Sequence, residues 1–160
     1  MKTRIVTGVV FGTALLCILF LFPAVCLPIV LSLLCGMAVY EILQVTGIAR
    51  QRLLLVFSVV FSMLVPFFRM LPSQLPAIGA FLAYTVVLAC IQVKCHETLR
   101  VEQTGLAFLM SVLVPVSLSC LGYMRLHNAH GLFYVMLGLI IPWACDIGAY
   151  FTGTFLGRHK

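Results

Sequence analysis

The chain has 160 residues, of which 63% are hydrophobic and only 9% are charged, and its mean hydropathy is +1.19. An ordinary soluble domain has an apolar share of roughly 45–50%, so this composition excludes a soluble protein and indicates an integral membrane protein. The net charge of +6 does not indicate nucleic-acid binding, because the basic residues are dispersed among connecting segments without interleaved aromatic residues. We expect no nucleic-acid partner.

Six apolar segments follow the basic start Met1–Arg4, and helices of about 20 residues cross a hydrocarbon core of ~30 Å. The first segment is uncharged and exceeds the ~7–15 residues of a signal-peptide core, and no small-x-small cleavage site follows, so we interpret it as a signal anchor. The composition thus predicts an all-α fold, a polytopic transmembrane helix bundle in which residues 1–160 form a single domain. The expected spans lie near residues 5–22, 24–41, 53–68, 75–93, 106–121 and 131–155.

Prolines inside the expected spans predict irregular helices. Pro66 lies late in the third span, where it can kink or end the helix, and Pro115 is expected to interrupt the fifth span. Pro142 is expected to break the sixth span just before Trp143. Such a break frees backbone carbonyl groups, which membrane proteins tolerate chiefly where the segment is buried or lines a cavity.

Several potential metal ligands lie in two polar segments, residues 94–102 and 122–130, which we expect to be loops. Cys95, His96 and Glu97 are adjacent in sequence, and adjacent residues on a short loop rarely converge on one ion, so a solvated loop is the favoured interpretation. His127 and His130 lack a nearby third ligand.

The seven cysteines are odd in number and irregularly spaced, and we interpret them as small hydrophobic residues rather than a disulfide or metal framework.

Loop charges predict the orientation of the chain, because cytoplasmic loops carry more Lys and Arg than loops on the other side. We therefore expect a multi-pass protein with both termini in the cytoplasm. Eight basic residues fall on one side (Lys2, Arg4, Arg50, Arg52, Lys94, Arg100, Arg158 and Lys160), and only Arg69 and Arg125 fall on the other.

The last expected span places a carboxylate inside an apolar segment. On a helix of 3.6 residues per turn, Asp146 shares one face with Tyr150, Gly153 and Gly157. A charged residue inside a membrane costs ~2.5 kcal/mol or more, so it is by default a candidate functional residue.

Ala149, Gly153 and Gly157 form a repeated small-xxx-small pattern, which allows another helix or a ligand to approach the backbone closely. Arg158 and Lys160 follow at the helix end that favours cations and can pair with phosphate groups.

Three interpretations of this face remain open. The first is a catalytic site. In the second, a small transporter or ion-pathway subunit uses Asp146 and the broken sixth helix as an ion or proton site, although the six spans show no inverted repeat. In the third, the seam of Ala149, Gly153 and Gly157 packs helices together, for example in a homodimer, without any chemistry.

The pattern Asp146-x-x-Ala149-Tyr150-x-x-Gly153-x-x-x-Gly157-Arg158-x-Lys160 resembles the central motif of the bacterial phosphatidate cytidylyltransferase (CDP-diglyceride synthase) family. Glu41 and the opening Arg4-Ile-Val-Thr-Gly8 also resemble family positions, though more weakly. The resemblance covers the N-terminal portion of a longer family architecture, in which a Ser-Pro-Lys-Lys-Thr-like segment and a Lys-, Arg- and Asp-rich signature follow the motif. It implies a multi-pass protein of the bacterial inner membrane.

The resemblance also implies the chemistry, which is transfer of CMP from CTP to phosphatidic acid to give CDP-diacylglycerol and pyrophosphate, with Mg²⁺ as cofactor. Asp146 is then the expected catalytic residue, suited to hold a metal or to orient a basic partner. Tyr150, Arg158 and Lys160 are the expected substrate-binding residues. The metal ligands are left unassigned, and we expect the 160 residues to be inactive on their own.

Overall fold

The computed structural model of the chain describes residues 12–13, 15–48 and 51–156, except for the side chains of residues 155 and 156. All regular secondary structure within these residues is helical, so the predicted all-α fold class is confirmed. Residues 15–21 are helical, and five longer helices follow: α2 (Cys26–Val45), α3 (Arg52–Phe68), α4 (Leu75–Lys94), α5 (Val101–His127) and α6 (Gly131–Leu156).

Four helices of the described part are long and apolar enough to cross a membrane: α2, α4, α5 and residues Gly131–Thr154 of α6. Helix α3 is equally apolar but has only 17 residues. Large hydrophobic side chains such as Leu82, Val86 and Leu109 are more than half exposed. Lipid-facing helices present surfaces of this kind, so the architecture is a polytopic helical membrane bundle.

Glycine and proline set several of the turns between helices. Gly47 follows α2 with φ +75°, the left-handed conformation that glycine adopts without steric cost and that commonly ends a helix. Pro76 lies in the first turn of α4, where its missing N–H costs no hydrogen bond. Gly131 begins α6 so close to the carbonyl oxygens of Met124 and Arg125 that a side chain there would collide with them. The α5–α6 turn is therefore tight.

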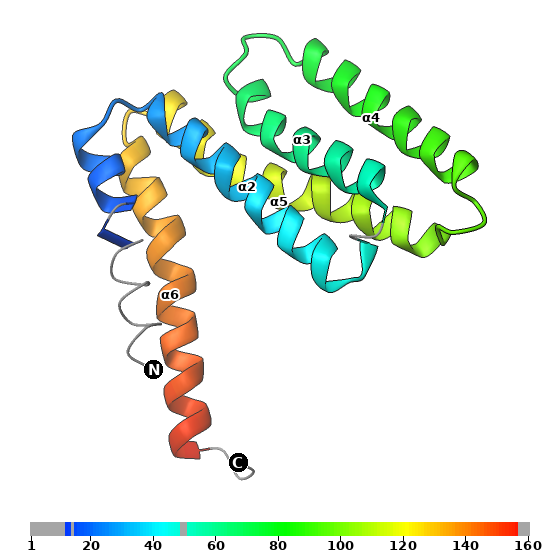
Figure 1. The fold of residues 1–160 in the computed structure, drawn as a ribbon. Helices are drawn as coiled ribbons and strands as arrows, with labels where there is room; N and C mark the ends of the chain where they lie inside the picture. The colour runs from blue at the N-terminus through cyan, green and yellow to red at the C-terminus, as the bar shows by residue number, and fades with distance from the viewer. Residues whose placement is uncertain (1–11, 14, 49–50, 157–160) are drawn as a thin grey trace.

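Helices α2, α3 and α5 pack against one another, and α4 lies outside them against α3 and α5 (Figure 1). A first core of buried side chains from α2 to α5 includes Val39, Leu54 and Leu88. A second, smaller core includes Leu31 of α2 and Val135 of α6. Helix α6 packs against α5 near its own start and then runs away from the bundle (Figure 1).

The structure corrects the expected helix breaks. Pro115 and Pro142 both lie inside continuous helices, so the predicted interruptions of the fifth and sixth spans are wrong. Pro66 likewise lies within α3, which ends two residues later. A proline removes one hydrogen bond of the helix, and neighbouring turns can carry the helix past that loss.

The polar loops are also shorter than expected. Residues 122–127 form the last turns of α5 instead of a loop, and Val101 and Glu102 already belong to its first turn. Hydropathy alone predicts the end of the helix where the apolar run ends. A helix that leaves the hydrocarbon core can continue into the polar headgroup region, where polar side chains are solvated.

Candidate functional site on helix α6

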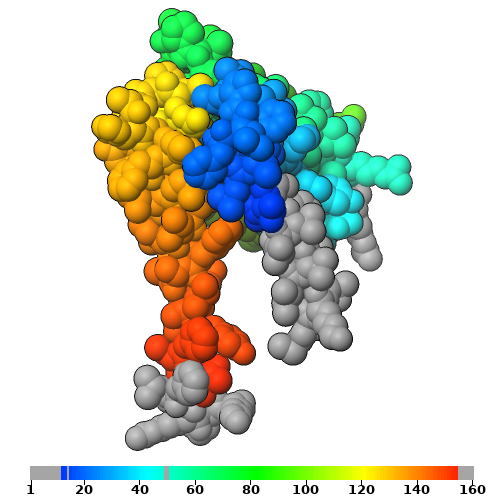
Figure 2. Space-filling model, turned by 90° about the vertical axis from the view of Figure 1, so that its left-hand side faces the viewer, coloured from blue at the N-terminus to red at the C-terminus, as the bar shows by residue number. Residues whose placement is uncertain are grey.

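The two halves of α6 lie in different surroundings. In the first half, Val135 is buried, and Leu132, Met136 and Leu139 pack against the second core. From Ile141 onward, every residue whose side chain is described is exposed. Figure 2 shows the second half of α6, drawn in orange to red, extending away from the body of the molecule. The predicted site therefore lies on the free half of the helix.

Asp146 and Tyr150 lie one turn apart on this free half. Both side chains are exposed, with 67% of Tyr150 accessible, and the Asp146 carboxylate has no hydrogen bond or ion pair with another described residue. The nearby Trp143 side chain lies close to Gly12. A Cβ atom built on Gly12 would lie 3.9 Å from Trp143 Cη2. Within the described residues, both the carboxylate and the phenol are therefore accessible to a ligand or another helix.

The small-residue seam is open in the same way. A side chain built on Gly153 would meet no atom within 4 Å among the described residues, and the same holds for Gly148. Thr152 donates its hydroxyl to the carbonyl oxygen of Gly148 at 2.9 Å, and this bond keeps its polar group within the helix. The proposed packing role of Ala149 and Gly153 stays a prediction. Gly157, Arg158 and Lys160 lie outside the described residues.

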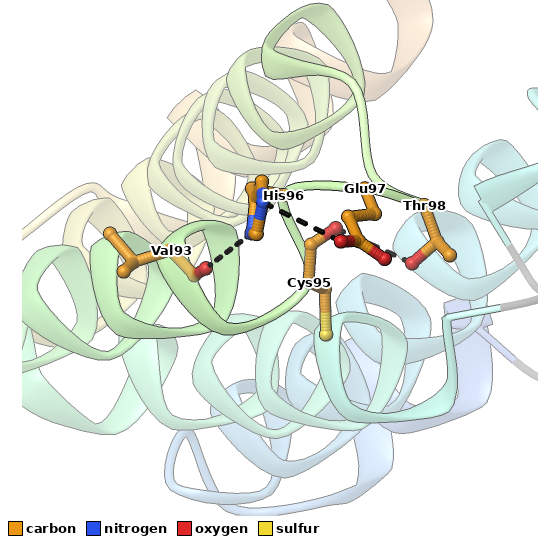
Figure 3. Close-up of polar contacts among 5 residues, drawn as sticks. All are labelled: Val93, Cys95, His96, Glu97 and Thr98. Atoms are coloured by element: carbon orange, nitrogen blue, oxygen red, sulfur yellow. Dashed lines mark hydrogen bonds and ion pairs between the residues drawn. The ribbon is translucent and has the colours of Figure 1, made fainter.

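The described residues contain no group of three or more His, Cys, Asp and Glu side chains that could hold a metal ion. Asp146 can supply one carboxylate oxygen, which suits Mg²⁺, since that ion is commonly held by one or two carboxylates together with substrate phosphates. In the loop after α4, His96 Nε2 lies 4.0 Å from Glu97 Oε1 (Figure 3). The Cys95 sulfur points away from both groups (Figure 3).

Sequence reasoning missed a buried polar cluster between α3, α4 and α5. The hydroxyl of Tyr84 lies 2.9 Å from Ser58 Oγ and 2.6 Å from Ser111 Oγ. The Tyr84 ring stacks on Phe61 with centroids 4.0 Å apart. The sequence does place a polar residue in the middle of each of three expected spans. It does not reveal which of these residues form hydrogen bonds with one another.

The connections also show which helix ends lie together. Gln51 Nε2, just before α3, donates a hydrogen bond of 2.9 Å to Thr98 Oγ1 in the loop before α5. At the opposite end, the guanidinium carbon of Arg69 lies 5.8 Å from the ring centroid of Tyr123. Arg52, Lys94 and Arg100 therefore lie at one end of the bundle and Arg69 at the other.

Long apolar helices define a polytopic membrane protein, and the exposed Asp146 marks a candidate site on α6. The sequence profile of the cytidylyltransferase family matches residues 2–160, so the chain belongs to that family. The chain is similar to the phosphatidate cytidylyltransferase of Bacillus subtilis (strain 168), with 26% identity over 179 residues. The match covers all of this chain but only 61% of that relative's length. No solved structure gives a significant match.

Proposed function

We propose that the natural gene product containing this chain is a nucleotidyltransferase that transfers CMP from CTP to phosphatidic acid. The observation that carries the proposal is the family match over residues 2–160, within which an exposed acid lies on an apolar helix. The similarity to a phosphatidate cytidylyltransferase supports the choice of substrates. The chain spans 61% of that relative, so the activity is proposed for the whole gene product.

The proposed reaction joins a lipid to a water-soluble nucleotide. An oxygen of the phosphatidate phosphate attacks the α-phosphorus of CTP, and a new P–O bond forms. The bond from the α-phosphorus to the bridging oxygen of the β-phosphate breaks, and pyrophosphate leaves with the electron pair. Catalysis of phosphoryl transfer rests mainly on positioning and on stabilising the phosphate charge, so the site needs cations close to the headgroup level.

Within this reaction, Asp146 is the proposed catalytic residue. Mg²⁺ is the proposed cofactor, and it would neutralise phosphate charge; Asp146 would hold it or orient a basic partner. The Tyr150 hydroxyl, one turn away, donates to a phosphate oxygen in this proposal. Arg158 and Lys160 are the proposed phosphate-pairing cations, since a guanidinium and an ammonium both bind phosphate.

The same proposal sets the orientation of the protein. CTP is a cytoplasmic nucleotide, so the free half of α6 must end on the cytoplasmic side. The excess of Lys and Arg at the Arg52, Lys94 and Arg100 end supports this orientation. We therefore propose a multi-pass protein of a bacterial inner membrane, with both termini of this chain in the cytoplasm.

The test is CTP-dependent labelling of phosphatidic acid. Membranes from cells expressing the natural gene product receive dioleoyl phosphatidate in mixed micelles, cytosine-labelled CTP and Mg²⁺, and lipid-soluble label is counted. We expect Asp146→Asn to lower labelling by about 100-fold or more, as expected when an acid that stabilises transition-state charge is removed. Cys145→Ala, a neighbouring exposed position on the same helix, is the control and should retain activity.

Immunoblots of washed membranes establish that each variant is inserted at the level of the unmodified protein. Lipid labelling that survives Asp146→Asn would remove Asp146 from the site while leaving the family activity intact. No CTP-dependent lipid product from the unmodified gene product, at matched expression, would overturn the proposed function itself.

A further inference from the structure

A hollow outside the α6 site lies between α3, α4 and α5, near the helix ends that include Arg69. It has a volume of about 180 Å³ and is walled by apolar side chains that include Phe61, Val65, Phe81 and Val112. Phe81 is 37% exposed and Val116 38%, so the hollow reaches the lipid-facing surface of the bundle. An apolar occupant can therefore enter from the bilayer.

Polar groups line only one end of this hollow. Arg69 follows the last turn of α3, and Gln74 precedes the first turn of α4. The guanidinium of Arg69 has no hydrogen bond or ion pair with another described residue, and its only described ring contact is with the face of Tyr123. A guanidinium over a ring face keeps its edge N–H groups available as donors.

No described carboxylate side chain pairs with Arg69. The sequence has four acidic residues, and none lies near this end of the bundle. Glu41, Glu97 and Glu102 belong to the opposite end, and Asp146 lies on the free half of α6. The hollow thus combines an apolar interior with an uncompensated positive charge at its rim.

We propose that this hollow binds one acyl chain of an anionic phospholipid whose phosphate pairs with Arg69. Its volume is below the roughly 300–1,000 Å³ of pockets that enclose a whole small-molecule ligand, but it suits part of one chain. Gln74 adds a second polar group at headgroup level. The site is separate from the proposed catalytic face, because Asp146 lies 15 residues, or about 22 Å of helix, beyond the start of α6.

The headgroup decides which lipid binds. An acyl chain that enters the hollow leaves one hydrocarbon environment for another, so its transfer contributes little selectivity. The contact of Arg69 with a phosphate distinguishes a net anionic headgroup from a zwitterionic one, whose ammonium group offsets the phosphate charge. We expect a preference of roughly fivefold, which corresponds to ~1 kcal/mol.

The test is photo-crosslinking of the natural gene product in bilayer nanodiscs. Phosphatidylglycerol or phosphatidylcholine carries the same diazirine-labelled acyl chain, and adducts are mapped by peptide mass spectrometry. We expect adducts on the α3, α4 and α5 segments that wall the hollow, about five times more abundant with phosphatidylglycerol. Arg69→Gln should abolish this excess, whereas Arg69→Lys should retain most of it and Arg125→Gln all of it.

Two further arms test the apolar part of the site. Ala77→Phe places a ring in the hollow and should abolish adducts from both lipids there, while adducts elsewhere on the protein persist. Glycerol 3-phosphate in solution should not compete, because it lacks an acyl chain. Equal labelling by the two lipids, an excess that survives Arg69→Gln, or effective competition by glycerol 3-phosphate would overturn the proposal. None of these results depends on CTP-dependent activity.

Discussion

Tyr84 of α4 donates a hydrogen bond of 2.9 Å to Ser58 of α3, and both side chains are buried. The same hydroxyl lies 2.6 Å from Ser111 of α5. Helix α4 is the outer helix of the bundle, and this cluster joins it to both of its neighbours. In a hydrocarbon environment, where water cannot replace a lost partner, such bonds tie a peripheral helix to the core.

Tyr84→Phe tests this connection. The substitution keeps the ring that stacks on Phe61 and removes only the hydroxyl, so the unfolding free energy should fall by about 0.6–1.7 kcal/mol. Unfolding by SDS in mixed micelles, followed by circular dichroism, measures the change. Tyr40→Phe is the matched control, because Tyr40 is exposed and, among the described residues, its hydroxyl accepts only a bond from Gln44 Nε2. An equal loss in both variants would contradict a special role of the buried cluster.

A close approach of α2 and α3 at Gly36 gives a second prediction. A Cβ at this position would lie 2.7 Å from Met63 Cγ and 2.9 Å from its Sδ, so Gly36→Ala forces Met63 to move. Overpacking of this kind costs about 1–3 kcal/mol, and alanine gains ~1 kcal/mol over glycine in a helix, so the unfolding free energy should fall by up to about 2 kcal/mol.

The matched control is Gly79→Ala on α4, where a Cβ would meet nothing within 4 Å. There, only the helix-propensity gain operates, and the unfolding free energy should rise or stay the same. The difference between the two variants, measured by the same SDS titration, isolates the steric cost. Two variants of equal stability would show that Met63 adapts without cost.

The sequence predicted the helices because long apolar runs have few alternatives in a membrane. It failed at Pro142, where a proline was expected to break the helix, although one lost hydrogen bond leaves α6 continuous. It also ended α5 too early, at residue 121, because hydropathy marks the hydrocarbon boundary and not the helix end.

The candidate site was predictable only in part. Helical periodicity places Asp146 and Tyr150 on one face, and the structure keeps both on one continuous helix. Periodicity could not indicate that this half of α6 leaves the bundle, because helix directions depend on packing between distant segments. The Tyr84 cluster was hidden for the same reason, since Ser58 and Ser111 lie 26 and 27 residues from it in sequence.

Tyr150→Phe tests the proposed phosphate contact of the α6 face. If its hydroxyl donates to a substrate phosphate, kcat/KM for CTP-dependent lipid labelling should fall by roughly fivefold to tenfold, the loss of ~1 kcal/mol or slightly more. Tyr150 is 67% exposed, so the unfolding free energy should change by less than ~0.5 kcal/mol. Tyr134→Phe, on the same helix and also exposed, is the control and should retain full activity. Equal activity of the two variants would exclude a role for the Tyr150 hydroxyl.

Gly153→Leu tests whether the small-residue face of α6 is a packing surface. No described atom lies within 4 Å of a Cβ there, so the substitution should leave the unfolding of this chain's own bundle unchanged. If another helix packs on this face, leucine holds the two backbones apart, and association should weaken by about tenfold or more. Energy transfer between donor- and acceptor-labelled copies, diluted with lipid, measures self-association.

The control for this last prediction is Gly148→Leu. A Cβ on Gly148 would likewise meet no described atom within 4 Å, but Gly148 lies about 140° around the helix from Gly153, away from the seam. Loss of energy transfer in Gly153→Leu alone would support a homodimer through the seam. Unchanged energy transfer together with lost lipid labelling in Gly153→Leu would indicate instead that the face packs within one copy or admits a substrate. If Gly153→Leu changes neither measurement, the seam has no packing role.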